Sequence, residues 1–374
     1  MDLLIRSVLP GQQLDSAQVE RLRSETTPEA LLPLAAYHGV SGMAYEALRP
    51  MLPQTDPLLG QLKARYERAV IGHMRVAHGL IRVREAMTLA ECKWAVIKGP
   101  VIVEMLYDGV PGRRAYGDLD LLVHPAGFAD ALDALGAMGA ILHDRNWAVL
   151  RRDMRGEVHL SLPSGVPLDL HWNLINMYRG RMRIDTAEVV ARAVDVENDG
   201  IAIPSLGPED AILHLALHAA LSGGDRLLWL KDIERGVEVW RPDWNLILER
   251  ARRWRVGPPV GLMLGRSHDV LGAKIPDGVP DQLIGAGRRR VARWVDWVSP
   301  WQFGMGRLAA PTRLIARSIG KGPIGAPAWI LWRGLRNLDR GQERRSLAFT
   351  PSGDDRDRRA FIEAIVAIGR ESNA

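Results

Sequence analysis

The stretch "YGDLDLLVHP", from Tyr116 to Pro125, contains two acidic residues separated by one leucine and followed by an apolar run. The run from Leu119 to Val123 is typical of a buried β-strand. Because alternate side chains of a strand share a face, Asp118 and Asp120 should point the same way, about 7 Å apart. Two carboxylates at that spacing repel each other unless a divalent cation lies between them, and oxygen ligands suit magnesium or manganese. The alternative is a pair of acids at an exposed strand end.

The residues around this acidic pair argue against some kinds of site. A calcium-binding loop needs polar residues and glycine after its first acids, but Leu121, Leu122 and Val123 follow here. In haloacid-dehalogenase phosphatases and many glycosyltransferases the acids come after an apolar strand, whereas here they precede one. Both enzyme classes are therefore disfavoured.

A predicted hairpin supplies a third acid. The segments "EVHLSL" and "VPLDLHW" alternate polar and apolar residues on either side of the three-residue loop "PSG". This loop length keeps the two polar faces together and sets His159 opposite Asp169, with Glu157 on the same face. If the hairpin pairs with the strand that begins after Asp118, three carboxylates converge. Such a trio can hold the two metal ions that in-line phosphoryl or nucleotidyl transfer uses.

Basic residues lie close to these acids in the sequence. Lys98 and Gly99 stand in a "KGP" turn between an expected strand and an expected helix, where free backbone N–H groups favour a phosphate. Arg113 and Arg114 come just before the acidic pair and are placed to clamp a triphosphate. Lys98 alone would be weak evidence, because a single lysine is usually solvated. The evidence for a phosphate site is the order of the lysine, the glycine, the two arginines and the acids along the chain.

The composition is that of a globular protein with one large or two ordinary domains: 374 residues, 47% hydrophobic and 25% charged. The single cysteine, Cys92, excludes a disulfide framework and a cysteine-based zinc site, which fits a reducing compartment. The apolar run near the N-terminus is too short for a signal peptide, and the most apolar helix, "AILHLALHAALSGG", is too short to span a bilayer. We therefore expect a cytoplasmic protein with no transmembrane segment.

The hydrophobic pattern divides the chain into four parts and predicts an α+β fold, a small mixed sheet with helices plus a helical C-terminal domain. Residues 1–57 should form a helical cap, and residues 58–204 an α/β core that begins with a long amphipathic helix over 58–89. Residues 205–340 should form a helical domain, which contains nine of the twelve tryptophans. Residues 341–374 should form a charged tail that is partly disordered.

Charge is unevenly distributed along the chain. Residues 241–345 contain 20 lysines and arginines against 8 acidic residues, although the net charge of the whole chain is only +5. Such a segment suits nucleic acid, an anionic membrane surface or an acidic peptide, but arginines solvated on helix surfaces give the same pattern and are commoner. Within it, "RLIARSIGKGPIGAPAWILWRGLR" mixes basic and aromatic residues, as either an interfacial segment or two helices packed through tryptophans would.

The order of these elements resembles the DNA polymerase beta superfamily of nucleotidyltransferases. In that superfamily a glycine-containing turn between strand and helix precedes an acid-x-acid strand, and a later strand carries a third acid. More narrowly, the K-G, R-x-x-G-D-x-D and D-x-H-W elements of "VIKGPVIVEMLYDGVPGRRAYGDLDLLVHP" and "PLDLHW", with "EDAILHLALHAALSGGDRLLWLKDI", are similar to a bacterial family of uncharacterised nucleotidyltransferases. Some members of that family accompany lasso-peptide biosynthesis genes. The resemblance covers roughly residues 60 to 240.

The resemblance implies roles for individual residues. Asp118 and Asp120 would bind both metal ions, while Asp169 would bind the catalytic metal and accept the proton of the incoming hydroxyl. Gly99 would lie against the triphosphate, and Gly117 belongs to the same nucleotide-binding group.

One departure from the superfamily pattern concerns the phosphate contacts. The small hydroxyl residue that usually stands beside the glycine is replaced by Lys98 and Pro100. Phosphate contacts therefore do not carry over residue by residue.

Together these features predict a metal-dependent nucleotidyltransferase with Mg²⁺ or Mn²⁺ as cofactor. It would move a nucleoside monophosphate from an NTP such as ATP to a hydroxyl acceptor. A peptide or protein side chain, a small metabolite and an RNA end are the candidate acceptors, in that order of preference. The alternative is a catalytically inactive module of the same fold that binds a peptide or a nucleotide.

Further histidines are candidate site residues. His214 and His218 are four residues apart on one face of an expected helix, the spacing of a metal-binding pair, and Asp232 follows. Because no third-ligand motif such as H-E-x-x-H accompanies them, a buried polar network is the favoured interpretation. For His171 three roles are open: it steadies Asp169, contacts the base, or is an interior histidine bonded to a carbonyl.

Overall fold

A seven-stranded mixed β-sheet forms the centre of the computed structural model, which describes residues 27–176, 182–285, 289, 290, 293 and 355–371. The strands are β1 (Trp94–Val96), β2 (Leu119–Val123), β3 (Ile141–Leu142), β4 (Glu157–Ser161), β5 (Pro167–His171), β6 (Val194–Asn198) and β7 (Ile201–Ser205). They lie across the sheet in the order β3-β4-β5-β2-β1-β7-β6. The predicted α+β class with a mixed sheet is confirmed.

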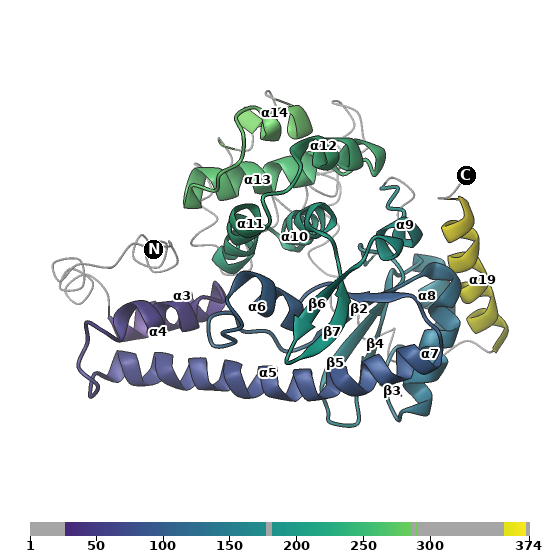
Figure 1. Cartoon of the computed structure of the whole chain (residues 1–374), viewed down its shortest axis with the longest axis horizontal. Helices are drawn as coiled ribbons and strands as arrows, with labels where there is room; N and C mark the ends of the chain where they lie inside the picture. The colour runs from purple at the N-terminus through teal and green to yellow at the C-terminus, as the bar shows by residue number, and fades with distance from the viewer. Residues whose placement is uncertain (1–26, 177–181, 286–288, 291–292, 294–354, 372–374) are drawn as a thin grey trace.

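Helices surround this sheet. Before and between the strands lie α3 (Pro28–Tyr37), α4 (Ser41–Leu48), α5 (Pro57–Leu89), α6 (Pro100–Leu106), the 3-10 turn η1 (Pro125–Gly127), α7 (Phe128–Ala137), α8 (Trp147–Asp153) and α9 (Thr186–Ala191). After the sheet come α10 (Pro208–Ser222), α11 (Leu227–Trp240), α12 (Trp244–Arg253), α13 (Gly257–Leu271), α14 (Val279–Ile284) and α19 (Asp355–Glu371). Figure 1 shows α5 along one side of the molecule and the layer of α10 to α14 on the opposite side, with the sheet between them.

Strand β2, which contains Asp120 and begins directly after Asp118, lies at the centre of the sheet. All five residues of β2 are buried, and the strand pairs antiparallel with β1 and parallel with β5. An apolar run of this kind is expected where a strand is covered on both faces. The position explains why leucines dominate β2 and why an acid there needs a partner.

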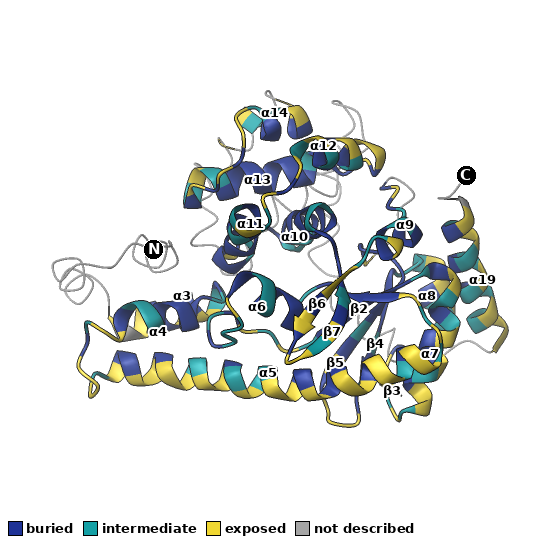
Figure 2. Cartoon of the chain, in the orientation of Figure 1, coloured by how far each residue is buried: buried dark blue, intermediate teal, exposed yellow. Residues whose placement is uncertain are grey.

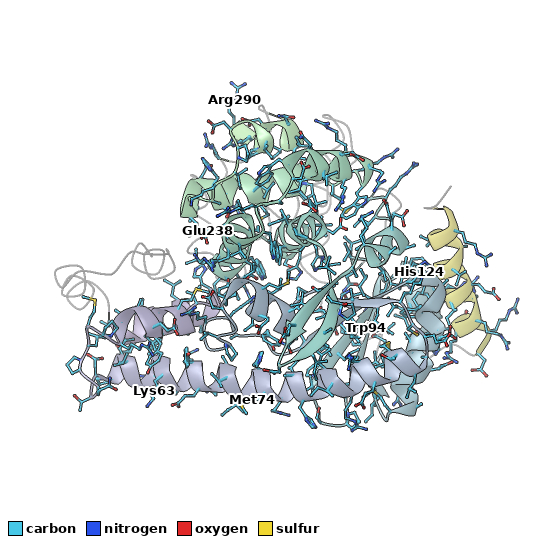
Figure 3. The ribbon with its side chains drawn as sticks, in the orientation of Figure 1. Lys63, Met74, Trp94, His124, Glu238 and Arg290 are labelled. Carbon is cyan, nitrogen blue, oxygen red and sulfur yellow. The ribbon has the colours of Figure 1, made fainter. Side chains whose placement is uncertain are left out.

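The predicted long helix is confirmed as α5. Asp56 caps its N-terminus by accepting a hydrogen bond from the Leu58 backbone N–H at 2.9 Å, and proline follows at the first helical position. Its buried residues recur at the helical spacing that gives one apolar face, among them Val76, Leu80, Val83 and Met87. The opposite face is solvent-exposed over much of its length (Figure 2), and Met74 projects from it (Figure 3).

The predicted hairpin is also confirmed. Strands β4 and β5 pair antiparallel with His159 opposite Asp169, and Gly165 closes the loop with a φ of 78°. The apolar faces of both strands are buried, as the alternation of residue types requires.

A second hairpin, β6–β7, extends the sheet on the other side and was not predicted. Its turn is Asp199–Gly200, and both residues have the positive φ that a two-residue turn of type I′ needs. Strand β7 then pairs with β1 in parallel, with the Ser205 hydroxyl donating a hydrogen bond to the Val96 carbonyl at 2.9 Å.

Part of the charged tail forms a helix that packs on the core. Within the charged tail, residues 355–371 form helix α19, whose Phe361 and Ile365 are fully buried. The Phe361 ring packs edge-on against Phe128, with ring centroids 6.3 Å apart. The spacing of these apolar residues is the sequence signal for the helix. The basic, aromatic stretch "RLIARSIGKGPIGAPAWILWRGLR" lies outside the described residues.

The helices that follow the sheet are joined to it by a buried ion pair. Arg114, in the loop before β2, donates from Nε and Nη2 to the carboxylate of Asp232 in α11, at 2.8–3.1 Å. The Tyr107 hydroxyl donates to the same carboxylate at 2.7 Å. In the described portion, no helix combines the length and the apolar composition needed to cross a membrane.

Replacing Asp232 with alanine should lower the free energy of unfolding by about 3–5 kcal/mol, because the guanidinium of Arg114 would stay buried without a counter-charge. Urea denaturation monitored by circular dichroism measures this loss. The matched control is Asp133→Ala, which removes an exposed ion pair with Arg358 and should cost less than about 1 kcal/mol. A loss in Asp232→Ala no larger than in the control would contradict the structural role of the pair.

Candidate functional site

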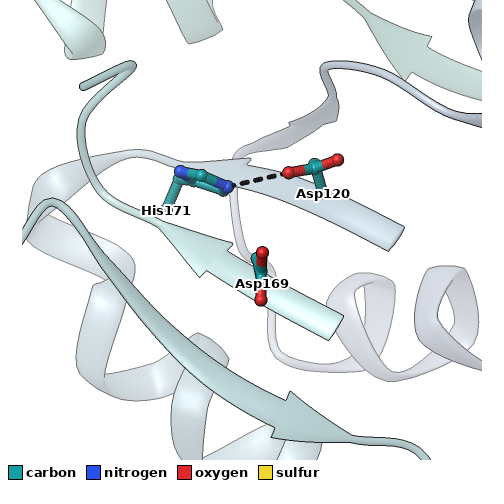
Figure 4. A group of neighbouring side chains, drawn as sticks. All are labelled: Asp120, Asp169 and His171. Atoms are coloured by element: carbon teal, nitrogen blue, oxygen red, sulfur yellow. Dashed lines mark hydrogen bonds and ion pairs between the residues drawn. The ribbon is translucent and has the colours of Figure 1, made fainter. Parts of the chain in front are cut away.

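Strands β2 and β5 bring the predicted acids to one place. In their parallel pairing Asp120 is the partner of Asp169, and Asp118 lies two residues before Asp120, just ahead of β2. The pairing of the hairpin with the acid-bearing strand, inferred from sequence, is therefore confirmed. Ligand atoms of Asp120, Asp169 and His171 lie within 4.8 Å of one another (Figure 4).

Asp120 is held by two cationic or hydrogen-bonding groups. Its Oδ1 lies 3.0 Å from Nζ of Lys98 and 3.1 Å from Nε2 of His171. Burial alone would raise the pKa of Asp120, but these two neighbours outweigh it and hold that pKa well below its usual range. Burial alone would lower the pKa of Lys98, but the charges of Asp120 and Asp118 outweigh it and raise that pKa. His171 thus contacts Asp120, not Asp169.

Asp118 has the opposite electrostatic environment. Its side chain is half-buried, and burial, followed by repulsion from Asp120, raises its pKa in spite of Lys98. The folded protein therefore disfavours a charge on Asp118 and favours one on Asp120, although only one residue separates the two in the sequence.

Asp169 faces several charged groups. Burial raises its pKa to about 6, His159 opposes that shift, and the carboxylates of Asp120 and Glu157 add to it. His159 itself has a pKa raised to about 9, chiefly by its hydrogen bond with Asp144. Asp144 is fully buried and was not recognised as a site residue, because it follows a strand of only two residues.

The two glycines of the site differ in their surroundings. Gly99 precedes α6 with a φ of 67°, and a Cβ there would lie 3.2 Å from the Tyr116 ring, so both its backbone and its neighbours call for glycine. A Cβ on Gly117 would meet no atom within 4 Å. The space beside Asp118 is therefore open at Gly117.

Both arginines expected at a triphosphate have protein partners. Arg113 lies 2.7 Å from carboxylate oxygens of Glu46 and Asp108, and its side chain is partly exposed. Arg114 is buried against Asp232, as described above. In this structure Arg114 serves the junction between the sheet and α11.

On α10 His214 is buried and His218 is partly buried, and both lie within the electrostatic reach of Lys98. Their ring centroids are 6.1 Å apart, and the His218 ring packs edge-on against Trp229. Neither ring nitrogen of His214 has a hydrogen-bond partner among the described residues. Asp232 is paired with Arg114, so it does not complete a metal site with the two histidines.

The comparisons with known proteins identify the family. A family model described as "Uncharacterised nucleotidyltransferase" matches residues 24–272, more than half of the chain. The chain belongs to this family. No curated protein and no solved structure gives a significant match. The resemblance seen in the sequence motifs is thereby confirmed at the level of the family.

The donor set of this nucleotidyltransferase family member fits a divalent cation. Carboxylate oxygens of Asp120 and Asp169 lie close together, and hard cations such as Mg²⁺ prefer oxygen ligands. Nζ of Lys98 supplies a positive charge at Oδ1 of Asp120. Asp120, Asp169 and His171 are described residues whose ligand atoms lie close enough together here to share one ion.

Substituting Asp118 and substituting Asp120 should affect stability differently when metal is removed with EDTA. Asp118→Asn should leave the free energy of unfolding unchanged or higher, because it removes a charge that the fold disfavours. Asp120→Asn should lower it by about 2–4 kcal/mol, because Lys98 and His171 would lose their shared carboxylate. Chemical denaturation of both variants measures the difference, and equal losses would contradict the assigned environments.

His214 should make stability depend on pH. Burial lowers its pKa to about 3, whereas an unfolded histidine titrates near 6.5, so between these values the unfolded chain binds the extra proton. Stability should therefore fall as pH decreases through this range, by up to about 1.4 kcal/mol per pH unit for this one group. His214→Gln should remove that contribution, while His78→Gln, at an exposed position on α5, should leave it in place. An unchanged slope in His214→Gln would show that the residue does not titrate in this way.

Proposed function

We propose that the chain is a metal-dependent nucleotidyltransferase that moves a nucleoside monophosphate from an NTP to a hydroxyl acceptor. Membership of the family supports the reaction class. The observation that carries the proposal is the parallel pairing of β2 with β5, which sets Asp120 beside Asp169 with Asp118 two residues away. Three acids so placed can hold the metal ions that in-line transfer at phosphorus uses.

In the proposed reaction the acceptor oxygen attacks the α-phosphorus of the NTP. The bond from the α-phosphorus to the bridging oxygen breaks, and pyrophosphate leaves. Bound Mg²⁺ or Mn²⁺ would neutralise the triphosphate and the developing negative charge. Asp118 and Asp120 would hold the cation and the nucleotide, and Asp169 would take the proton of the attacking hydroxyl.

The remaining site residues would position the nucleotide. Lys98 brings a positive charge to Asp120, where a triphosphate would need one. The open space at Gly117 leaves room beside Asp118, and Gly99 keeps the backbone close to Tyr116. Arg113, which is partly exposed, is the better placed of the two arginines for a triphosphate, because Arg114 is buried.

The acceptor is proposed to be a peptide or protein hydroxyl before a small metabolite or an RNA end. Within the described part of the basic region, Arg289 and Arg293 pair with acids of the same region, Asp269 and Asp281. Arginines neutralised in this way contribute less to a phosphate backbone, which puts nucleic acid last.

One observation favours a second candidate, a module of the same fold that binds a ligand without transfer. Lys98 and His171 both contact Oδ1 of Asp120, so the ammonium already compensates the charge that a metal ion would compensate. A chain that used Lys98 permanently in this way would bind a nucleotide without needing the cation.

The two candidates are separated by mass spectrometry of candidate acceptors after incubation with mixed nucleotides and magnesium. A transferase adds the mass of a nucleoside monophosphate, which identifies both the nucleotide and the acceptor. Nucleotide binding without any added mass on peptides, metabolites or RNA would favour the binding module.

Asp169→Asn should separate nucleotide binding from transfer. We expect nucleotide and magnesium affinities within about tenfold of the wild type, but a loss of transfer of at least ~10³, because the substitution removes a metal ligand and a general base together. Titration calorimetry and an assay of pyrophosphate release measure the two quantities. Asp133→Asn, at an exposed position on α7, serves as the control and should change neither. Transfer at the wild-type rate in Asp169→Asn would refute its proposed role.

A further inference from the structure

The hairpin carries a second group of metal-ligating side chains, on the far side of Asp169 from β2. Glu157, His159 and Asp169 each offer one ligand atom, and these three atoms lie within 4.8 Å of one another. Glu157 and His159 belong to β4, and neither is part of the proposed catalytic trio. The proposed transfer reaction therefore does not explain why Glu157 and His159 lie beside Asp169.

The separations within this group are those of ligands that share one ion. Nε2 of His159 lies 3.6 Å from Oε1 of Glu157 and 3.8 Å from Oδ1 of Asp169. These distances exceed the roughly 3.0 Å of a hydrogen bond. Two ligands of a tetrahedral ion, each bound at about 2.1 Å, are about 3.4 Å apart. Small side-chain movements would bring all three atoms to that spacing.

The histidine is oriented as a metal ligand. Its Nδ1 donates to Oδ2 of Asp144 at 2.7 Å, which directs Nε2 toward the two carboxylates. The same Asp144 oxygen accepts a hydrogen bond from the His159 backbone N–H at 2.9 Å, so the carboxylate is fixed. A carboxylate on the far nitrogen is the usual second partner of a metal-bound histidine.

An independent observation points into the same group. His171 is 5% exposed, and its Nδ1 has no hydrogen-bond partner in the described ranges. That nitrogen nevertheless lies 3.2 Å from Oε2 of Glu157, an ion-pair distance without hydrogen-bond geometry. Glu157 also accepts a hydrogen bond from the Asn176 side chain. A buried nitrogen therefore faces the carboxylate that the cation would use.

The site is accessible from one side. The side chains of His159 and Asp169 are partly exposed, while Glu157 and Asp144 are buried. An ion could enter from the exposed side and keep water in its remaining positions. One imidazole nitrogen and two carboxylates suit a transition-metal ion better than Mg²⁺ or Ca²⁺, which prefer oxygen alone.

We propose that Glu157, His159 and Asp169 bind a divalent transition-metal ion such as Zn²⁺ or Mn²⁺, at a site distinct from Asp118 and Asp120. The proposal does not require nucleotide transfer, although it shares Asp169 with the proposed catalytic trio. Figure 4 shows one oxygen of Asp169 directed toward the Asp120–His171 pair and the other directed away from it. One carboxylate can thus serve both sites.

The test uses Co²⁺ as the probe with the full-length, metal-free protein. Its visible absorption reports on coordination, and proton NMR of the complex should show a shifted, exchangeable signal from the Nδ1–H that His159 gives to Asp144. His159→Gln should lose at least tenfold in Co²⁺ affinity and lose that signal. Asp144→Asn, which leaves all three ligands in place, should weaken binding by about 10–100-fold. His143→Gln is the matched control, because this exposed histidine contacts Ser161 instead.

Asp118→Asn distinguishes this proposal from the proposed function. It should abolish nucleotide transfer and leave Co²⁺ binding at the hairpin unchanged, so either proposal can fail alone. Equal Co²⁺ affinity in the wild type and in His159→Gln would overturn the site, as would loss of Co²⁺ binding in Asp118→Asn. If His159→Gln does not fold, the absence of a shifted histidine signal in the wild-type complex would overturn it equally.

Discussion

The parallel pairing of β2 with β5 is the interaction on which the rest of the structure depends. It joins the acid-bearing strand to the hairpin at the centre of the sheet, with Asp120 and Asp169 as register partners. Since a strand slipped by one residue would turn every side chain to the opposite face, the buried leucines of both strands hold the register. The same apolar packing that stabilises the fold therefore sets the position of the acids.

Placing acids inside a sheet has an electrostatic cost that the neighbouring residues offset. Asp120 is nearly inaccessible to water and is compensated by Lys98 and His171, whereas Asp118 and Asp169 have raised pKa values. A protein selected only for stability would replace such a group by apolar residues, because buried ion pairs contribute little net stability. A cation bound near these carboxylates would offset the repulsion that raises the pKa values of Asp118 and Asp169.

The parts of the fold that depend on local pattern could be predicted from the sequence. Helix α5, strand β2 and the hairpin of β4 and β5 follow from apolar spacing and a turn of defined length, and the match of Asp169 to Asp120 follows from their polar faces. The hairpin of β6 and β7 was missed although Asp199–Gly200 is a turn signal, because Pro204 interrupts the apolar pattern of its second strand.

The partners of individual site residues could not be predicted, because they come from distant segments brought together by packing. Arg114 was expected at a triphosphate and lies instead against Asp232, 118 residues later in the chain. The contact of His159 with Asp144 depends on a strand of two residues, which has no recognisable pattern. Sequence spacing identifies which side chains share a face of one element, but a side chain that bridges elements is determined by tertiary geometry. In this chain the position of Asp120 beside Asp169 follows from the pairing of two strands and could be predicted. The partners of the basic residues and histidines around them lie mostly on other elements and could not.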